Sequence, residues 1–261
     1  MIESLNSPHI ARVKALISSR GVKERKAAGE FVAEGFQCFR EAIVSKNGPK
    51  IQSLYLTPSA RVKLDELTDL SLVNTFDVTD EVMRAMSETI TPQGILAICA
   101  IPQVELSLLP LNGKRKFIYL SEVQDPGNAG TILRSADAFG MDAVITSPGS
   151  VDMYSPKVVR STAGSLWHIP VFEGVLLTDL LSDPKLHSFS LGADGTQSLS
   201  SMTVVGDTVA IFGNEARGLS TVQSTLGIKV VSIPMPGDAE SLNLSAAASI
   251  VMYHLAHMQA S

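Results

Sequence analysis

The chain has 261 residues, of which 45% are hydrophobic and 18% charged, and its formal net charge is −5. This length exceeds the usual size of one domain, so we expect two domains whose cores are large enough to fold without disulfide or metal cross-links. The acidic balance argues against a protein that coats nucleic acid over its whole surface.

Neither a membrane segment nor a metal site is predicted. No apolar run reaches the ~18 residues needed to span a bilayer, and the first residues lack the basic and apolar regions of a signal peptide, so we expect a cytoplasmic protein. The two cysteines, Cys38 and Cys99, lie in apolar contexts without CxxC or Cys/His spacing. This pattern predicts buried free thiols.

The first hundred residues alternate between helical and strand patterns. A helix is expected over residues 7–28, with Ser7 and Pro8 at its start and Gly21 as a candidate interruption. The elements expected after it are strands at 30–35, 51–56, 71–76 and 93–101, and helices at 36–44, at 60–67 and from 79 onward. Prolines and an Asn-Gly pair then mark a linker. The pattern predicts a small α/β domain.

Basic residues are concentrated at the front of the chain. Residues 1–50 carry nine Lys and Arg against five Asp and Glu, whereas residues 119–261 carry six against thirteen. The basic cluster falls on the predicted first helix and consists of Arg12, Lys14, Arg20, Lys23, Arg25 and Lys26. Grouped Lys and Arg side chains are what contacts with RNA phosphates require, although a solvated helix face gives the same pattern.

The second half of the chain again alternates strands and helices. Strands are expected at 116–120, 143–146, 169–172, 188–191, 208–212 and 228–233, and helices at 129–139, 155–164, 176–181 and 245–257. This order predicts a mainly parallel sheet whose functional loops follow the carboxyl ends of its strands. No G-x-G-x-x-G sequence follows a strand, which disfavours a dinucleotide-dependent oxidoreductase.

Three segments share one design, in which a strand ends in a polar, glycine-containing loop that starts a helix. They contain Asn-x-Gly-x-x-x-Arg at 128–134, Gly-Asn-Glu-x-x-Gly at 213–218, and Ile-Pro-Met…Ser-Leu-Asn-x-Ser at 233–245. In order and spacing these resemble the three motifs of the SpoU (TrmH-like) family of RNA ribose 2′-O-methyltransferases. Together with Ser-Thr-Ala-Gly-Ser at 161–165, the resemblance covers most of residues 115–261.

The front of the chain resembles the substrate-binding domain found in that family, which is similar to ribosomal protein L30e. Residues 31–35, 40–42 and 87–94 carry this looser resemblance. It implies an RNA-binding domain over residues 1–105, a linker over 106–114 and a methyltransferase domain over 115–261. It also favours ribosomal RNA over transfer RNA as the substrate.

The resemblance implies that the C-terminal sheet forms a deep trefoil knot, which pattern reasoning alone would have disfavoured. In the family this knot binds S-adenosylmethionine, largely through backbone groups. Carried over by position, the cofactor-binding residues are Gly213, Ile233, Leu242 and Leu244. The family also forms homodimers through its last helix, so a homodimer is expected.

The reaction that the resemblance implies is attack of a ribose 2′-hydroxyl on the sulfonium methyl group. The residues expected to carry it are Arg134, Asn128, Glu215, Ser241 and Asn243. The family assigns the proton to the arginine, yet a guanidinium normally donates hydrogen bonds rather than accepting a proton. Two readings stay open: Arg134 loses its proton beside the sulfonium, or it fixes the target phosphate while Glu215 or a phosphate oxygen accepts the proton. Asn128 is expected to cap its helix and to aim Arg134, and Ser241 and Asn243 to orient the reacting groups.

Two other readings are carried forward beside ribosomal RNA methylation. One is a transfer RNA 2′-O-methyltransferase, and the other is a non-catalytic RNA-binding or ribosome-associated protein on the same fold. Retention of Arg134, Glu215 and Asn243 argues against the latter, because binding alone does not need all three.

Overall fold

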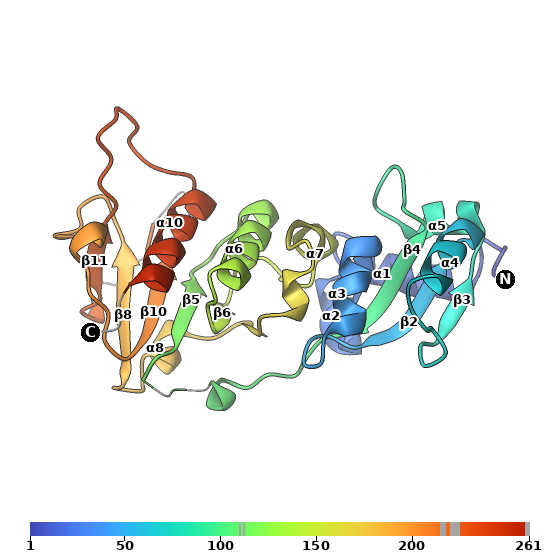
Figure 1. Ribbon diagram of the computed structural model, residues 1–261, viewed down its shortest axis with the longest axis horizontal. Helices are drawn as coiled ribbons and strands as arrows, with labels where there is room; N and C mark the ends of the chain where they lie inside the picture. Colours follow the sequence, from blue (N-terminus) through green and yellow to red (C-terminus); the bar gives the residue numbers. More distant parts are fainter. Residues whose placement is uncertain (110, 112, 215–217, 220–224, 259–261) are drawn as a thin grey trace. The chain divides into compact units, whose positions relative to one another are not determined.

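The computed structural model describes residues 1–109, 111, 113–214, 218, 219 and 225–258. They form two compact units, the first made of Met1–Gln103 with Tyr154–His168, the second of Val104–Met153 with the residues from Ile169 onward. No described helix has the length and apolar character required to cross a membrane. Figure 1 shows the elements of each unit along the chain.

In its described part, the first unit contains a four-stranded sheet with the strand order β1-β4-β2-β3. β4 is antiparallel to both of its neighbours, and β3 runs parallel to β2. The helices and strands of residues 1–103 are α1 (Pro8–Ile17), α2 (Val22–Ala28), β1 (Glu30–Glu34), α3 (Phe36–Val44), β2 (Ile51–Leu56), α4 (Pro58–Asp65), β3 (Thr75–Asp77), α5 (Asp80–Met86) and β4 (Ile95–Ala100).

The segment 154–168 packs on this first sheet. It contains α7 (Pro156–Ser161) and the short 3-10 helix η2 (Ser165–Trp167). The Trp167 ring lies 6.0 Å from that of Phe31 on β1, and its indole nitrogen donates a hydrogen bond to the Pro49 carbonyl oxygen at 3.0 Å. These contacts explain why a segment from the middle of the chain belongs to the N-terminal unit.

The segment predicted as a helix over residues 7–28 consists of two helices, α1 and α2, so the candidate interruption at Gly21 is confirmed and a single helix of that length is not. A Cβ at Gly21 would lie 2.7 Å from the Leu16 carbonyl oxygen, so only glycine allows the close turn between the two helices. The Arg25 guanidinium enters this turn and donates a hydrogen bond to the same carbonyl oxygen. Arg25 is only 3% exposed and therefore serves the fold.

The described part of the second unit contains a seven-stranded sheet with the order β7-β6-β5-β10-β8-β11-β9, and every pairing in it is parallel. The prediction of an α/β fold with a mainly parallel sheet is therefore confirmed. Its elements are η1 (Leu106–Leu108), β5 (Lys116–Leu120), α6 (Pro126–Ala138), β6 (Ala143–Thr146), β7 (Val171–Phe172), α8 (Leu177–Leu180), β8 (Leu186–Leu191), β9 (Gln197–Ser198), η3 (Leu199–Ser201), β10 (Asp207–Phe212), β11 (Lys229–Ser232) and α10 (Leu244–His257).

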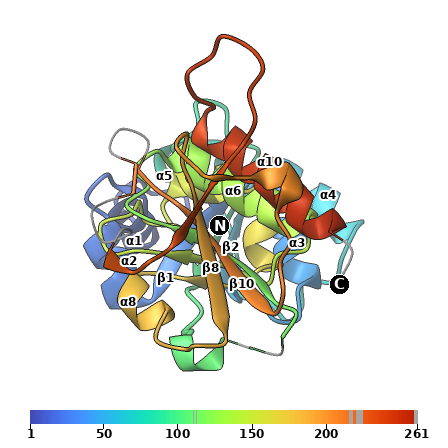
Figure 2. The same ribbon diagram turned by 90° about the vertical axis from the view of Figure 1, so that its left-hand side faces the viewer.

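The two faces of this sheet are covered differently. One face buries Val209 and Ile211 of β10 in a core that also contains Leu180 of α8. α6 and α10 pack against each other, and α10 also contacts β10 (Figures 1 and 2). Because alternate residues of a strand face opposite sides, Ala210 and Phe212 point away from the α8 side.

Candidate functional site

A cavity of 370 Å³ lies where β8, β10 and β11 end at the carboxyl edge of the sheet. This is the edge at which open parallel sheets bind ligands, and the volume falls within the range of small-molecule sites. Its walls come from the ends of these strands, from the loop after β11 and from the first turn of α10. The described lining residues are Leu191, Gly192, Ala193, Phe212, Gly213, Asn214, Gly218, Leu219, Val231, Ile233, Met235, Glu240, Ser241, Leu242, Asn243, Leu244 and Ala247.

The turn after β10 forms one wall of the cavity. Asn214 and Gly218 exchange two backbone hydrogen bonds of 2.9 and 2.8 Å, which close the turn. A Cβ at Gly213 would stand 2.4 Å from the Gly218 carbonyl carbon, so the turn itself requires glycine there. Gly218 has a φ of +64°, which also favours glycine. Both glycines are thus explained by the protein's own backbone rather than by a ligand.

Asn214 also joins this turn to the loop that follows β5. It is 9% exposed, and its side-chain amide donates a hydrogen bond of 2.8 Å to the Glu122 carbonyl oxygen. Glu122 has a φ of +51°, an uncommon conformation for a residue with a side chain. The contact therefore fixes the entry to α6 relative to the end of β10.

The loop between β11 and α10 forms the opposite wall, and it stands away from the sheet in Figures 1 and 2. Within the described part of the chain, residues 234–242 make no hydrogen bond. Leu242 is 38% exposed although it is apolar. This wall thus offers unpaired backbone groups and an uncovered leucine to a ligand.

α6 and α10 begin beside each other, and a hydrogen bond joins their first turns. Asn243 is the N-cap of α10, because its side-chain oxygen Oδ1 accepts from the backbone N–H groups of Ser245 and Ala246 at 2.9 and 3.3 Å. Its amide nitrogen donates to the Asn128 side-chain oxygen at 3.1 Å. These hydrogen bonds fix the orientation of the Asn243 side-chain amide. Its oxygen faces the helix start, and its N–H groups are the ones that can donate to a neighbouring group.

Asn128 does not cap its own helix, and that part of the sequence interpretation is wrong. The cap is Asp125, whose carboxylate accepts from the Asn128 backbone N–H at 2.7 Å, and Pro126 occupies the first turn. The helix consequently starts three residues earlier than predicted.

The predicted catalytic residues are only partly brought together. Ser241 and Asn243 line the cavity, and Asn128 is bonded to Asn243. Arg134 lies two turns further along α6, is exposed and is not among the lining residues, so the structure gives no contact through which Asn128 would aim it. Glu215 lies outside the described residues.

All four predicted cofactor-binding residues, Gly213, Ile233, Leu242 and Leu244, line the cavity. Sequence reasoning missed the wall at the carboxyl end of β8, made of its last residue Leu191 and of Gly192 and Ala193 after it. The available signal was a Gly-Ala pair directly after a predicted parallel strand. It also missed Glu240, which is in the third motif but was assigned no role.

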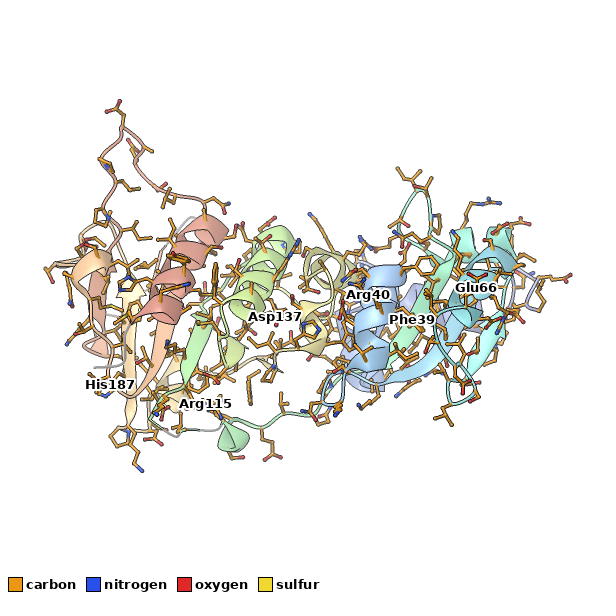
Figure 3. The ribbon with its side chains drawn as sticks, in the orientation of Figure 1. Phe39, Arg40, Glu66, Arg115, Asp137 and His187 are labelled. Carbon is orange, nitrogen blue, oxygen red and sulfur yellow. The ribbon has the colours of Figure 1, made fainter. Side chains whose placement is uncertain are left out.

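No described lining residue is a histidine. His187 lies at the amino end of β8, at the edge of the sheet away from the cavity, as does Arg115 before β5 (Figure 3). Among the described residues, no group of three His, Cys, Asp or Glu side chains is arranged to hold a metal ion.

The fold and the cavity define an α/β protein with a small-molecule site at the carboxyl edge of a parallel sheet. Residues 115–253 match the model of the SpoU rRNA Methylase family, and residues 8–97 match that of the MRM3-like substrate binding domain. The chain belongs to the SpoU rRNA methylase family, which confirms the family inferred from the three motifs.

Characterised relatives share this architecture over nearly their whole length. The chain is 31% identical over 235 residues to the 23S rRNA (guanosine(2553)-2′-O)-methyltransferase of Bacillus subtilis, covering 89% of this chain and 91% of that protein. The structure of an AdoMet-bound rRNA methyltransferase from Sinorhizobium meliloti is similar with a TM-score of 0.84 and 25% identity, covering 97% and 96% of the two chains. The SpoU methyltransferase AviRb of Streptomyces viridochromogenes, in complex with AdoMet, gives 0.83 and 26%, covering 96% and 97%.

Proposed function

We propose that this protein is an enzyme that transfers the methyl group of S-adenosylmethionine to a ribose 2′-hydroxyl of ribosomal RNA. The observation that supports the proposal is the cavity at the ends of β8, β10 and β11, two of whose walls are built from the second and third family motifs. The Bacillus relative, which methylates a ribose of 23S ribosomal RNA, supports the substrate class.

The lining of the cavity fits this cofactor. Apolar side chains and backbone groups dominate it, as a flat adenine ring requires, and none of its described residues is a Lys, Arg or His that would repel a cationic ligand. Gly213, Ile233, Leu242 and Leu244 would hold the adenosine part. The bound cofactor would supply an electrophilic methyl group on a positively charged sulfur.

The reacting end is assigned to Asn243, Ser241 and Asn128. The fixed Asn243 amide donates a hydrogen bond toward the ribose, and Asn128 holds that amide in place. Ser241 adds a hydroxyl group that can orient the 2′-oxygen. Neither Asn243 nor Asn128 can accept the proton, because both amides lack a basic group.

Arg134 is assigned to the RNA. As an exposed cation on α6, it would bind the phosphate of the target nucleotide bidentately and bring the 2′-hydroxyl to the site. Of the two roles left open by the sequence, its exposure favours this one, and the proton then passes to Glu215 or to a phosphate oxygen. Arg134→Ala should abolish methyl transfer and leave S-adenosylmethionine binding nearly intact. Turnover like that of the wild type would exclude the assignment.

Residues 1–105 are assigned to RNA binding and residues 115–261 to the chemistry, joined by 106–114. In the basic cluster of the first 26 residues, the exposed cationic groups available for phosphates are Lys14, Arg20, Lys23 and Lys26. Arg25 is removed from this set because it is buried, and Arg12 is paired with Glu30. Neutralising Lys23 and Lys26 together should weaken RNA binding and flatten its salt dependence. An unchanged salt slope would place the RNA elsewhere.

A homodimer through α10 completes the proposal. The helix buries Val251, Met252 and Leu255, yet Ile250 and Tyr253 on its other side are 41% and 56% exposed. The Tyr253 ring packs edge-on against Phe139 with ring centres 5.9 Å apart, which extends the apolar surface onto the end of α6. Sedimentation at micromolar concentration tests this state, and a monomer would remove the claim.

The knot and the location also belong to the proposal. α10 follows β11 in the chain and packs back on α6 and β10. A knot needs such a return, because the C-terminal segment must pass through a loop of the chain. An experimental trace through residues 213–245 tests the threading. A cytoplasmic location is tested by cell fractionation.

The decisive experiment maps 2′-O-methyl groups on ribosomal and transfer RNA from cells with and without the gene. Loss of one ribosomal methyl group, restored by the wild type and not by Arg134→Ala, is expected. Loss confined to transfer RNA would select the transfer RNA enzyme. No loss, together with no calorimetric binding of S-adenosylmethionine, would select a non-catalytic RNA-binding protein.

A further inference from the structure

Glu240 is the only charged side chain among the described residues that line the cavity. It lies on the exposed loop after β11, three residues before the α10 N-cap Asn243. No described residue forms a hydrogen bond or an ion pair with its carboxylate. An acidic group at a largely apolar wall, with no partner in the protein, requires a partner of opposite charge or contact with water.

The proposed reaction changes the charge of the molecule in this cavity. In the transfer, the 2′-oxygen forms a bond to the methyl carbon while the carbon–sulfur bond breaks. The bonding electron pair stays on sulfur, and the hydroxyl proton goes to the base. The sulfur thereby loses its positive charge, so the ligand changes from a net charge of about +1 to about zero. A carboxylate at the wall distinguishes these two ligands by Coulomb attraction alone.

We propose that Glu240 recognises the positive sulfur of the methyl donor, so that the cavity binds S-adenosylmethionine in preference to the demethylated product, S-adenosylhomocysteine. This inference rests on the proposed function and assigns to the site a residue that discriminates cofactor from product. The consequence is that methyl transfer weakens the hold on the spent cofactor and favours its release.

Because Glu240 is exposed, water screens its attraction, and the effect is a modest one. A unit charge about 6 Å away in a water-like medium changes binding by about threefold at low ionic strength. The preference should decline as salt is added, because the Debye length falls from ~30 Å at 0.01 M to ~8 Å at 0.15 M. This salt dependence separates an electrostatic effect from a change in the shape of the loop.

The test is calorimetric titration of the full-length protein and of Glu240→Gln with three ligands. These are S-adenosylmethionine, S-adenosylhomocysteine, and the analogue sinefungin, in which a charged amine replaces the sulfonium methyl group. The substitution should weaken binding of the two cationic ligands by about threefold in low salt and leave the product unchanged. Asp238→Asn removes a carboxylate from the same exposed loop outside the lining and should alter none of the three affinities.

Each other outcome is decisive. Equal weakening of all three ligands would show that Glu240 contacts a group they share, such as the amino group, and would overturn the charge discrimination. Unchanged affinities, or an equal effect of Asp238→Asn, would overturn it as well. If the wild-type protein binds none of the ligands, the proposed function itself fails, a result distinct from the preceding ones.

Discussion

Replacing Asn243 separates two tasks that this side chain performs at once. Its side-chain oxygen caps α10 by accepting from the backbone N–H groups of Ser245 and Ala246, while its side-chain nitrogen donates to Asn128. Asn243→Ala removes both interactions, whereas Asn243→Asp keeps an oxygen acceptor at the helix start and removes only the donor. The two variants should therefore differ in stability and agree in activity.

The sizes of these effects follow from the contacts. Loss of an N-cap costs about 1 kcal/mol, and loss of an exposed hydrogen bond to Asn128 adds at most about 1 kcal/mol. For a chain of this size, Asn243→Ala should lower the melting temperature by roughly 3–6 °C. Asn243→Asp should stay within about 0.5 kcal/mol of the wild type, because a carboxylate is favourable at a helix N-terminus. Both variants should lose at least about tenfold in methyl transfer, the value of one hydrogen bond of about 1.4 kcal/mol.

Thermal unfolding and transfer of a labelled methyl group to ribosomal RNA measure the two effects on the same samples. The reasoning about the donor is refuted if Asn243→Asp is as active as the wild type. The reasoning about the cap is refuted if Asn243→Ala melts at the wild-type temperature. If Asn243→Asp were as unstable as Asn243→Ala, the bond to Asn128 rather than the cap would hold the start of α10.

Three further predictions concern the backbone and the core. Arg25→Met should lower the free energy of urea unfolding by about 2 kcal/mol, because it leaves the Leu16 carbonyl oxygen at the end of α1 without its hydrogen-bond donor. The exposed control Lys26→Met should stay within about 0.5 kcal/mol of the wild type. Equal effects of the two substitutions would contradict the structural role of Arg25 and make it a candidate for RNA binding again. Gly213→Ala should weaken S-adenosylmethionine binding at least about tenfold, because the added carbon displaces the turn after β10. The control Gly237→Ala should bind normally, since no described atom lies within 4 Å of its added carbon. Normal binding by both variants would contradict the close approach of Gly213 to the Gly218 backbone. Burial raises the pKa of the Cys38 thiol from 9.0 to about 11. The contribution of this thiol to the free energy of unfolding is therefore complete below pH 9 and is lost as the pH rises toward 11. The free energy of unfolding should depend less on pH across this range in Cys38→Ala, and an identical pH profile would show that Cys38 does not cause the dependence.

Most helices and strands could be predicted because their signals are local. Pro156 at the first turn of a helix, Gly140 after a helix and the β-branched run that ends at Ser232 act within a few residues of their position. The same holds for the three motifs, whose polar loops follow strands. Residues of the second and third motifs do line one cavity, and the first motif reaches it only through the bond between Asn128 and Asn243. The catalytic and binding roles assigned to these residues remain predictions, as do the domain boundaries.

The errors arose where local signals compete with packing. The helical pattern continues past Gly21, which the sequence marked only as a candidate interruption, whereas the Leu16 carbonyl oxygen leaves no room for a side chain there and ends the first helix. Arg25 has the composition of a phosphate-binding residue but is buried against that turn. Asn128 is a good N-cap by type, but Asp125 comes first and has Pro126 behind it.

The α/β class of the chain, its family and the loops that carry its polar residues could all be predicted from the sequence, because these properties depend on short-range periodicity and on residue type. Which of these residues come into contact depends on how the strands and helices are arranged in space. β10 lies between β5 and β8, so that the turn after Phe212 faces the loop after β11 across one cavity. Asn128 and Asn243 touch although 115 positions separate them in the chain. Such contacts are set by strand order and helix packing, which no local pattern encodes.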